Sequence, residues 1–524
     1  MIRNIVFSKK GAVGIFILTA LVFLLRPFMT GQALAPFDFH EHFYNTLNTV
    51  ENYRQTGAFH TGDFSPAYAL FLFFLTGIIP STSVWFFFFI RLFIVLCGFF
   101  AVVLLNRLLK ILRPDALAAE IFFADTVFIM LYAKDSTAAT GSFLIVPVLL
   151  AAALSFYKTL TAPSVATGVM TGALLSFSLF VQWDAFLFAV TLVLVFYLQF
   201  NGKTPVTYRL FFKILTGFVI GLLPAAGLYY VQKDTFPSSY LLWQSVQDHE
   251  PWLVASLFLW YPIRYFIRMP LQLVYLTFPI ILCGLGAFVS FPKDVKKSTG
   301  KDTVFWTLVW YPLLWVLCAG MLTYIDLPVY AFYPFAIGAP FALAAVVEKI
   351  YENQKDLENE KLLLNRYCLV MAGVCLLVAF LQILTPSSAA YKPLTAAAGV
   401  FFEKNPSAVY AMGKGAGIAA YFNKKTSVIR VDGYAAPAGL IDDIRQSHAL
   451  GDVLRRLNAD FYIALTTPEK KDCTVLREPV KTFFGPNNRA TDGWACVPPV
   501  AETPVSKNLV LRLYKTSDLQ IRNK

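Results

Sequence analysis

The sequence predicts a polytopic α-helical membrane protein that ends in a soluble α/β domain. Hydrophobic residues make up 57% of the 524 residues and charged residues only 15%, whereas soluble proteins carry about a quarter charged residues. Apolar stretches long enough to cross a bilayer recur along the chain, separated by polar connections. After Pro386 the chain becomes more polar, and alternating strand-like and helix-like segments replace the apolar stretches.

We expect about 11 membrane spans, each close to the roughly 20 residues that a bilayer requires. The first follows a basic segment and has no small-residue cleavage site after it, so we interpret it as an uncleaved helix. The apolar segment 67–80 is too short to span and ends at Pro80, which favours a re-entrant or interfacial piece. The expected spans cover residues 11–29, 84–105, 116–133, 139–157, 163–181, 185–200, 210–230, 270–290, 303–322, 329–347 and 367–385.

The distribution of lysine and arginine predicts the orientation in an inner (plasma) membrane. These residues cluster in alternate connections, the pattern typical of cytoplasmic loops. The N-terminus is then cytoplasmic, and the loops 30–83 and 231–269 of a transmembrane domain, residues 1–385, are external. A C-terminal domain, residues 386–524, is also extracytoplasmic. The net charge of +12 follows from this bias and from contact with anionic membrane lipid, so we expect no nucleic-acid partner.

Within the C-terminal domain, residues 408–413, 427–433 and 508–514 are typical of strands, and 448–465 of a helix leading into a strand. The glycine run GKGAG at 413–417 lacks the full nucleotide-binding fingerprint, which favours a plain turn into a short helix. Cys473 and Cys496 lie outside the expected spans, on the side assigned to an oxidising compartment. We expect them to form a disulfide.

Titratable side chains are concentrated in the external connections, which is where chemistry is expected in so apolar a chain. Three of the five histidines lie in the first external loop. Its candidate site residues are Asp38, His40, Glu41, His42, His60 and Asp63. The short connection 133–141 carries Asp135. The loop 231–269 carries Asp248, His249 and Glu250, and then two arginines four positions apart on one helix face, Arg264 and Arg268.

Several of these residues also have a purely structural interpretation. Asp38 and Glu41 form a capping-box pattern for a helix through about Tyr53. Asp135 is a candidate N-cap for a helix that begins near Ser136. Two histidines two positions apart, such as His40 and His42, diverge on a helix, which disfavours paired metal ligation. Asp125, inside a span, is expected to pack or pair within the bundle.

Four segments resemble the GT-C glycosyltransferases. FDFHEHFYNTLNTVENYRQTG is similar to the aspartate-led start of their first external loop, and FSPAYALFLFFL to the stretch that closes it. MLYAKDSTAATG resembles their second acidic turn, and VYAFYPFAIGAPF resembles their late tyrosine-proline helix entry. The segment MGKGAGIAAYF and the strands after it are similar to soluble domains attached to bacterial members.

The resemblance implies transfer of a sugar from a polyprenyl-phosphate carrier to a glycan, lipid or protein acceptor on the extracytoplasmic face. Asp38 is then the first choice for the general base that an acceptor hydroxyl requires, and Asp135 is a second catalytic candidate. Arg264 and Arg268 are candidates for binding the leaving phosphate. The expected substrate-binding set is completed by His40, Glu41, His42, His60, Asp63, Tyr68, Asp248, His249, Glu250 and Tyr333. The turn before Tyr333 carries Asp326 but no lysine or arginine, which departs from the relatives.

Two other functions remain open. An oligosaccharyltransferase-like enzyme would bind a divalent metal through Asp38, Asp135 and either Asp248 or Glu250, because hard cations prefer oxygen ligands. The chain lacks the WWDYG motif of such enzymes, and its C-terminal domain has GWAC instead. A polytopic transporter is the second alternative, but no internal repeat supports it. Metal dependence and uptake by proteoliposomes distinguish these functions, and the sequence requires no other cofactor.

Overall fold

The structure is a computed structural model. It describes residues 9–29, 39–56, 66–162, 164–182, 185–200, 212–223, 270–290, 300–322, 332–353, 358–384, 391–431, 450–468, 474–479 and 490–519, apart from 115, 117, 140, 222, 414 and 425. Long helices fill the first part of the described chain, and all of its described strands follow residue 408. The chain thus has the predicted fold class, a helical bundle followed by an α/β region.

A helix lies at each of the expected spans. They are α2 (Lys9–Met29), α5 (Val84–Leu112), α6 (Ala118–Ala138), α7 (Ser142–Thr161), α8 (Val165–Val181), α9 (Phe186–Phe200), the helix Phe212–Gly221, α13 (Pro270–Ser290), α14 (Gly300–Leu322), α16 (Phe332–Asn353) and α17 (Glu358–Leu384). Within the described residues, four helices are long and apolar enough to cross a membrane: Val84–Leu112, Ser142–Thr161, Tyr333–Glu352 and Leu363–Leu384. The others include shorter apolar helices of the same bundle.

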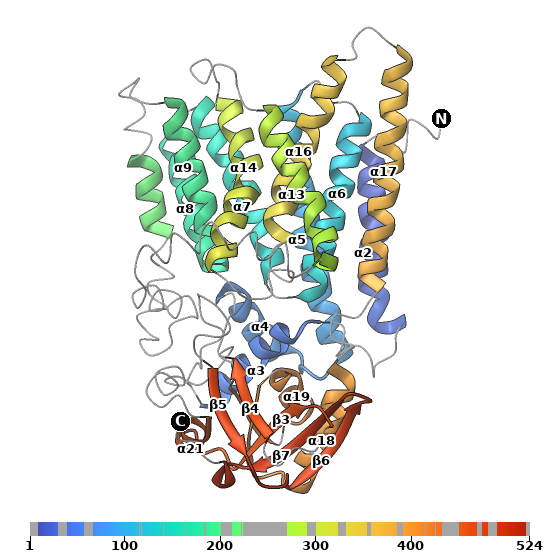
Figure 1. The fold of residues 1–524 in the computed structure, drawn as a ribbon. Helices are drawn as coiled ribbons and strands as arrows, with labels where there is room; N and C mark the ends of the chain where they lie inside the picture. Colours follow the sequence, from blue (N-terminus) through green and yellow to red (C-terminus); the bar gives the residue numbers. More distant parts are fainter. Residues whose placement is uncertain are drawn as a thin grey trace.

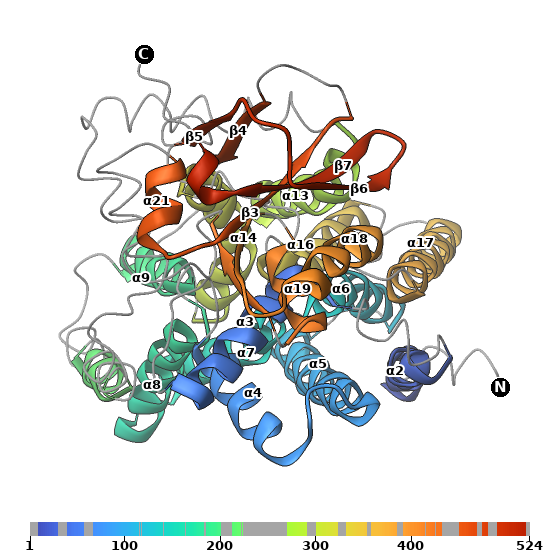
Figure 2. The same cartoon turned by 90° about the horizontal axis from the view of Figure 1, so that it is seen from below.

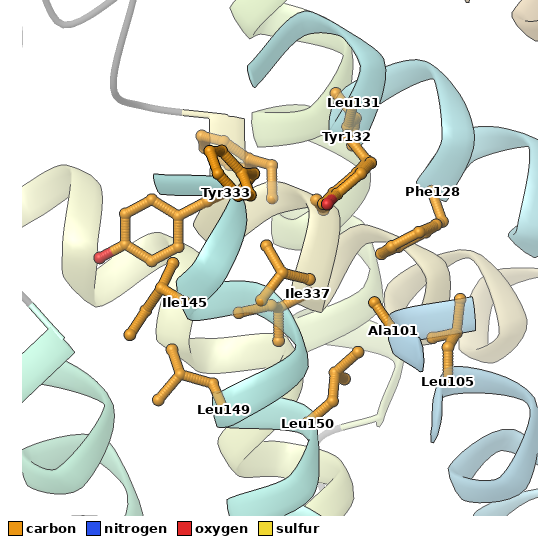
Figure 3. Close-up of a cluster of buried hydrophobic side chains, with 14 of the residues drawn as sticks. Ala101, Leu105, Phe128, Leu131, Tyr132, Ile145, Leu149, Leu150, Tyr333 and Ile337 are labelled. Carbon is orange, nitrogen blue, oxygen red and sulfur yellow. The ribbon is translucent and has the colours of Figure 1, made fainter. Parts of the chain in front are cut away.

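The long helices run side by side (Figure 1; Figure 2). Their apolar side chains form a common core. Helix α6 lies against α16 and α17, while α7 lies against α5 and α8. Figure 3 shows the centre of this core, where side chains of α6, α7 and α16 interlock around Ile337. Burying these residues in the bundle interior fixes which helix ends lie together.

Two shorter helices lie between the bundle and the strands: α3 (Glu41–Thr56) and α4 (Pro66–Ile78) (Figure 1). Helix α4 buries Tyr68, Ala69 and Leu72, whereas Phe74 and Ile78 on its outer side are exposed. It has 13 residues, too few to cross a bilayer at 1.5 Å per residue. Its position outside the bundle agrees with the expected interfacial piece that ends before Pro80.

The C-terminal region contains a five-stranded sheet in the order β2-β1-β3-β7-β6 and a separate β4–β5 pair. The strands are β1 (Val409–Met412), β2 (Ser427–Arg430), β3 (Phe461–Thr466), β4 (Thr474–Pro479), β5 (Ala490–Ala495), β6 (Ala501–Ser506) and β7 (Leu509–Lys515). Strand β1 runs parallel to β2 and β3, and β7 runs antiparallel to β3 and β6. The sequence predicted β1, β2, β3 and β7, but it missed β4, β5 and β6.

Helices cover both faces of this sheet. Along β1 the side chains alternate: Tyr410 and Met412 pack with α18 (Lys392–Lys404) and α19 (Ala416–Phe422), whereas Ala411 packs with α21 (Leu450–Arg456). This alternation is expected, because successive side chains of a strand point to opposite faces. The β4–β5 pair lies on the α21 side. The division of the chain into two independent domains at residue 386 remains a prediction.

The two ends of the bundle differ in charge and in what covers them. One end, here called the basic end, carries a row of cationic side chains at helix termini: Arg107, Lys110, Arg113, Lys158, Lys301, Lys349 and Arg366. The opposite end, the sheet end, lies next to α3, α4 and the strands (Figure 1). The first predicted external loop and the C-terminal region therefore lie at the same end of the bundle, as the charge distribution requires.

Candidate functional site

The candidate site is at the sheet end, around the first turn of α3. This helix begins at Glu41, where the amide of Phe43 donates to the carbonyl of His40 at 3.0 Å. The preceding Phe39 is fully buried, and its ring lies 4.7 Å from Phe43 and 5.9 Å from Phe87. Aromatic packing thus anchors the point at which the chain enters α3. Asp38, the residue directly before this anchor, lies outside the described residues.

Helix α4 holds the C-terminal half of α3. The guanidinium of Arg54 donates to the carbonyl of Phe73 and lies 4.5 Å from the centre of its ring. Tyr53 packs edge-on against the same ring, with 5.8 Å between centroids. Because Arg54 and Tyr53 of α3 both contact Phe73 of α4, the two helices pack as one unit at the sheet end.

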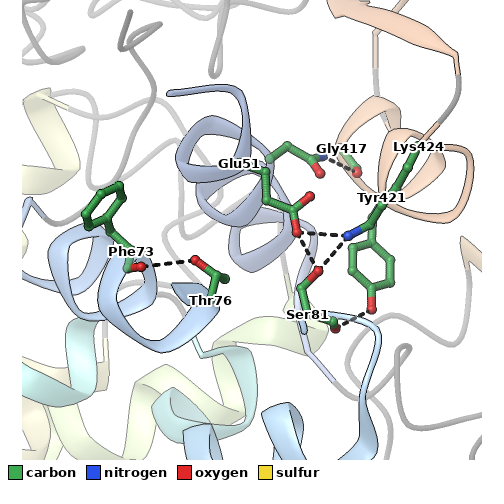
Figure 4. A network of polar contacts seen from close by, with 8 residues as sticks. Glu51, Phe73, Thr76, Ser81, Gly417, Tyr421 and Lys424 are labelled. Atoms are coloured by element: carbon green, nitrogen blue, oxygen red, sulfur yellow. Dashed lines mark hydrogen bonds and ion pairs between the residues drawn. The ribbon is translucent and has the colours of Figure 1, made fainter. Parts of the chain in front are cut away.

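Helix α19 of the C-terminal region holds the opposite side of α3. Tyr44, Asn48 and Glu51 recur at helical spacing along one stripe of α3, and each meets α19 or the residues that follow it. The Tyr44 and Tyr421 rings are 5.0 Å apart, and Asn48 Nδ2 donates to the Gly417 carbonyl at 2.7 Å (Figure 4). The α/β region is therefore joined directly to the helix that begins the candidate site.

A small polar network completes this contact. Lys424 Nζ donates to Glu51 Oε1 at 2.8 Å and to Ser81 Oγ at 2.5 Å, and Ser81 also bonds Glu51. The Tyr421 hydroxyl donates to the Ser81 carbonyl at 2.9 Å (Figure 4). Burial raises the pKa of Tyr421 above its ordinary range, with a smaller contribution from Glu51, so this hydroxyl remains a proton donor. Three segments distant in sequence thus meet at one cluster.

Tyr68, a predicted substrate-binding residue, lies in α4. Its ring is fully buried and lies edge-on to Phe143 of α7 at 5.4 Å. Burial raises the pKa of Tyr68 well above its ordinary value, so its hydroxyl stays protonated and is suited to donate a hydrogen bond rather than to act as a base.

Asp135 lies in the last turn of α6, which extends to Ala138. The prediction that it caps a helix beginning near Ser136 is therefore wrong, because the next helix begins at Ser142 after a Gly141 cap. The connection between α6 and α7 is correspondingly short. Its residue Ala139 is buried and has a φ of 51°, an unusual conformation for a residue with a side chain. Such strain is concentrated at functional sites.

The tyrosine-proline segment enters α16 as expected, because that helix begins at Phe332. Tyr333 is fully buried, and its hydroxyl accepts a hydrogen bond from Tyr311 at 3.1 Å. Tyr311 packs edge-on against Phe188 at 5.0 Å, and Tyr333 against Trp315 at 6.2 Å. This phenol pair joins α14 to α16.

The sequence interpretation overlooked Arg91. This residue of α5 is fully buried, and its Nη1 donates to the carbonyl of Phe23 at 2.7 Å. Its guanidinium lies 4.7 Å from the ring centre of Phe23 and 5.2 Å from that of Phe39. The signal was present in the sequence, because Arg91 interrupts an apolar run and ionisable residues inside bundles are functional candidates.

Most of the remaining predicted site residues lie outside the part of the chain that the structure describes. They are Asp38, His60, Asp63, Asp248, His249, Glu250, Arg264, Arg268 and Cys473. Glu41, His42 and Asp135 are placed by their backbone alone. Among the described residues, no group of three or more His, Cys, Asp or Glu side chains is arranged to hold a metal ion. The alternative metal site involves Asp38, Asp135 and either Asp248 or Glu250, and it stays an untested prediction.

Two structural expectations can be checked directly. Asp125 pairs within the bundle, where its Oδ1 accepts from Asn106 Nδ2 at 2.9 Å. Among the side chains that the structure describes, four cysteines of the bundle are free and buried: Cys97, Cys283, Cys368 and Cys375. Cys496 is disulfide-bonded, and its neighbour Ala495 is the register partner of Thr474. The pairing of Cys496 with Cys473 remains a prediction.

Comparison with known proteins identifies the fold. No protein-family profile and no curated sequence matches the chain. Its structure is similar to the crystal structure of ArnT from Cupriavidus metallidurans bound to undecaprenyl phosphate, with 12% identity and a TM-score of 0.51 over 96% of this chain and 98% of that one. The apo state of ArnT from the same organism matches with 13% identity and a TM-score of 0.49 over 97% and 98%. The chain thus has the GT-C-like fold that its sequence resembled.

Proposed function

We propose that this protein is a membrane glycosyltransferase that transfers a sugar from a polyprenyl-phosphate donor to an acceptor on the extracytoplasmic face. The observation that carries the proposal is the fold likeness over 96% of the chain to a protein whose crystal structure holds undecaprenyl phosphate. Because a fold alone does not imply a function, the residues at the sheet end must also suit the reaction.

The reaction requires a base, and Asp38 is the proposed one. An acceptor hydroxyl is a weak nucleophile, so a carboxylate must remove its proton as the new glycosidic bond forms. The bond between the sugar and the phosphate breaks at the same time, and the lipid phosphate leaves with the electron pair. Arg264 and Arg268 are proposed to stabilise the charge on that phosphate. Asp135 is proposed as a second acidic residue of the site.

The geometry of the described residues supports this location. Phe39, the residue that follows Asp38, is buried against Phe43 and Phe87, and the α16 entry is at the same end of the bundle. The outer side of α4 exposes Phe74 and Ile78 at this end. An apolar surface beside the site suits a donor whose isoprenoid tail lies in the membrane while its phosphate lies at the surface. The acceptor is a glycan, a lipid or a protein.

The test is sugar transfer by the purified protein, supplied with a panel of polyprenyl-phosphate sugars and a glycolipid acceptor. We expect transfer from at least one donor, and we expect the Asp38→Asn variant to abolish it while inserting and folding normally. Asp452→Asn is the matched control, because Asp452 on α21 pairs only at the surface with Arg455 at 3.3 Å. An Asp38→Asn variant that retained most of its turnover would exclude Asp38 as the base. Loss of transfer on addition of a chelator would favour the metal-dependent alternative.

A further inference from the structure

Helix α19 is a short helix of the α/β region that packs in two directions at once. Its Ala416 and Ala419 belong to the core beneath the sheet, together with Ile463. Its Ile418 and Tyr421 belong instead to the core of the helical bundle. We propose that α19 is a positioning element: through Gly417, Tyr421 and the adjacent Lys424 it fixes helix α3 and thereby the candidate site that begins at its first turn. This inference rests on the proposed function.

The glycine run gives the first part of the argument. Gly415 caps α19 with a φ of +87°, which a residue with a side chain rarely adopts. Gly417 has a different role, because a Cβ there would collide with Oδ1 of Asn45 and lie 3.3 Å from the backbone nitrogen of that residue. The missing side chain lets Asn48 reach the Gly417 carbonyl at 2.7 Å. The GKGAG run therefore serves helix docking rather than phosphate binding.

Tyr421 and Lys424 give the second part. The Tyr421 hydroxyl bonds the carbonyl of Ser81, and Lys424 bonds both Glu51 and the Ser81 hydroxyl (Figure 4). Ser81 belongs to the connection between α4 and α5. Because these bonds are directional, they specify one register of α19 on α3 and on that connection, which an apolar contact alone would leave free to slide.

The energetics separate positioning from simple stabilisation. The side chains of Lys424 and Glu51 are 38% and 21% exposed, and ion pairs that water reaches contribute little to stability. Their loss should thus hardly change the melting temperature. Displacing a catalytic group by about 1 Å lowers the reaction rate by about a hundredfold. Removing the Lys424–Glu51 ion pair is therefore expected to lower kcat.

The experiment compares variants of the full chain in lipid nanodiscs. The variants are Gly417→Ala, Lys424→Ala, Lys424→Arg and the charge exchange Glu51→Lys with Lys424→Glu. Lys404→Ala is the matched control, since Lys404 is an exposed lysine at the end of α18. Amide hydrogen exchange in residues 41–56 reports how firmly α3 is held, and kcat and KM for sugar transfer report the site.

We expect faster exchange in α3 and a kcat reduced about tenfold or more for Gly417→Ala and Lys424→Ala, with the melting temperature of Lys424→Ala within about a degree of wild type. Lys424→Arg and the charge exchange should restore both readouts in large part. Unchanged exchange in α3 for both variants overturns the proposal, as does faster exchange with an unchanged kcat. If the wild-type protein transfers no sugar from any donor, the proposed function fails, and the exchange comparison alone then supports or overturns the fixing of α3.

Discussion

At the scale of single residues, Arg91 shows how a buried charge organises the site. Its guanidinium joins α5 to the end of α2 through the carbonyl of Phe23. It also lies over the ring of Phe39, the residue that anchors the entry to α3. An ionised side chain inside a bundle is costly unless it is paired, and it is usually retained for function. Arg91 thus supports Phe39, the residue that follows the proposed base Asp38.

We expect Arg91→Leu to lower both the melting temperature and the rate of sugar transfer, because the charged hydrogen bond to Phe23 contributes roughly 1.5–3 kcal/mol. Arg91→Lys should recover part of the stability but less of the rate, since an ammonium cannot stack as a planar guanidinium does. Arg107→Leu, an exposed arginine at the basic end of the same helix, is the control. Thermal unfolding and transfer assays check this. An Arg91→Leu protein as active and stable as wild type would contradict it.

The phenol pair Tyr311 and Tyr333 allows packing to be separated from substrate binding. Each Phe substitution removes the same 3.1 Å hydrogen bond, so we expect both variants to lose about 1 kcal/mol of unfolding free energy. Only Tyr333→Phe should raise the KM for the lipid donor, because Tyr333 is the residue at the α16 entry. Equal KM values in the two variants would show that Tyr333 contributes to core packing and not to donor binding.

At the scale of elements, a disulfide lies directly beside the β4–β5 pair. Cys496 directly follows β5 and is disulfide-bonded, and the adjacent register pairs Thr474 with Ala495. We expect its partner to be Cys473. A loop of about two dozen residues closed in this way stabilises the folded state by roughly 3 kcal/mol on the chain-entropy estimate.

The pairing is checked by mass spectrometry of a non-reduced digest, which should contain one peptide that joins the segments around 473 and 496. Reduction should lower the thermal stability of the α/β region and leave the bundle unaffected, because the described cysteines of the bundle are free. A Cys473→Ser and Cys496→Ser double variant that melts as wild type does would contradict the stabilising role. Two free thiols in the digest would remove the disulfide itself.

At the scale of the whole molecule, the protein has one end that is basic and one that carries the α/β region. The cationic helix termini lie at the end opposite to the strands, where α16 ends and α17 begins (Figure 1). Lysine and arginine are retained on the cytoplasmic side of membranes. This polarity predicts that α3, α4 and the strands are extracytoplasmic and that the N-terminus is cytoplasmic.

A protease added to intact spheroplasts should therefore trim the chain from its C-terminal end, after about residue 386, and leave the 350–366 connection intact. An epitope tag at each position makes both outcomes visible on the same blot. Cleavage that occurs only after permeabilisation would invert the orientation. Asp38 and the α/β region would then face the cytoplasm, and the proposed donor would lie on the wrong side of the membrane.

The sequence by itself determined the helices of the bundle, because an apolar run of bilayer length leaves the backbone few alternatives to a helix. It also indicated the strands β1, β2, β3 and β7, and it correctly gave the short helix after the GKGAG run. These features depend on local composition and periodicity. Strands β4, β5 and β6 were missed because polar residues and prolines obscure their pattern, as in TPVS of β6.

Only the tertiary structure decided which of these elements meet. Lys424 and Glu51 are 373 positions apart, and no local pattern in either segment indicates that they form a pair. The need for Gly417 depends on Asn45 of another helix, and the placement of Arg91 depends on Phe23 and Phe39 of two further segments. Such contacts arise when several packed surfaces are satisfied together. For that reason candidate site residues could be predicted from the sequence, but the long-range contacts of Lys424, Gly417 and Arg91 could not.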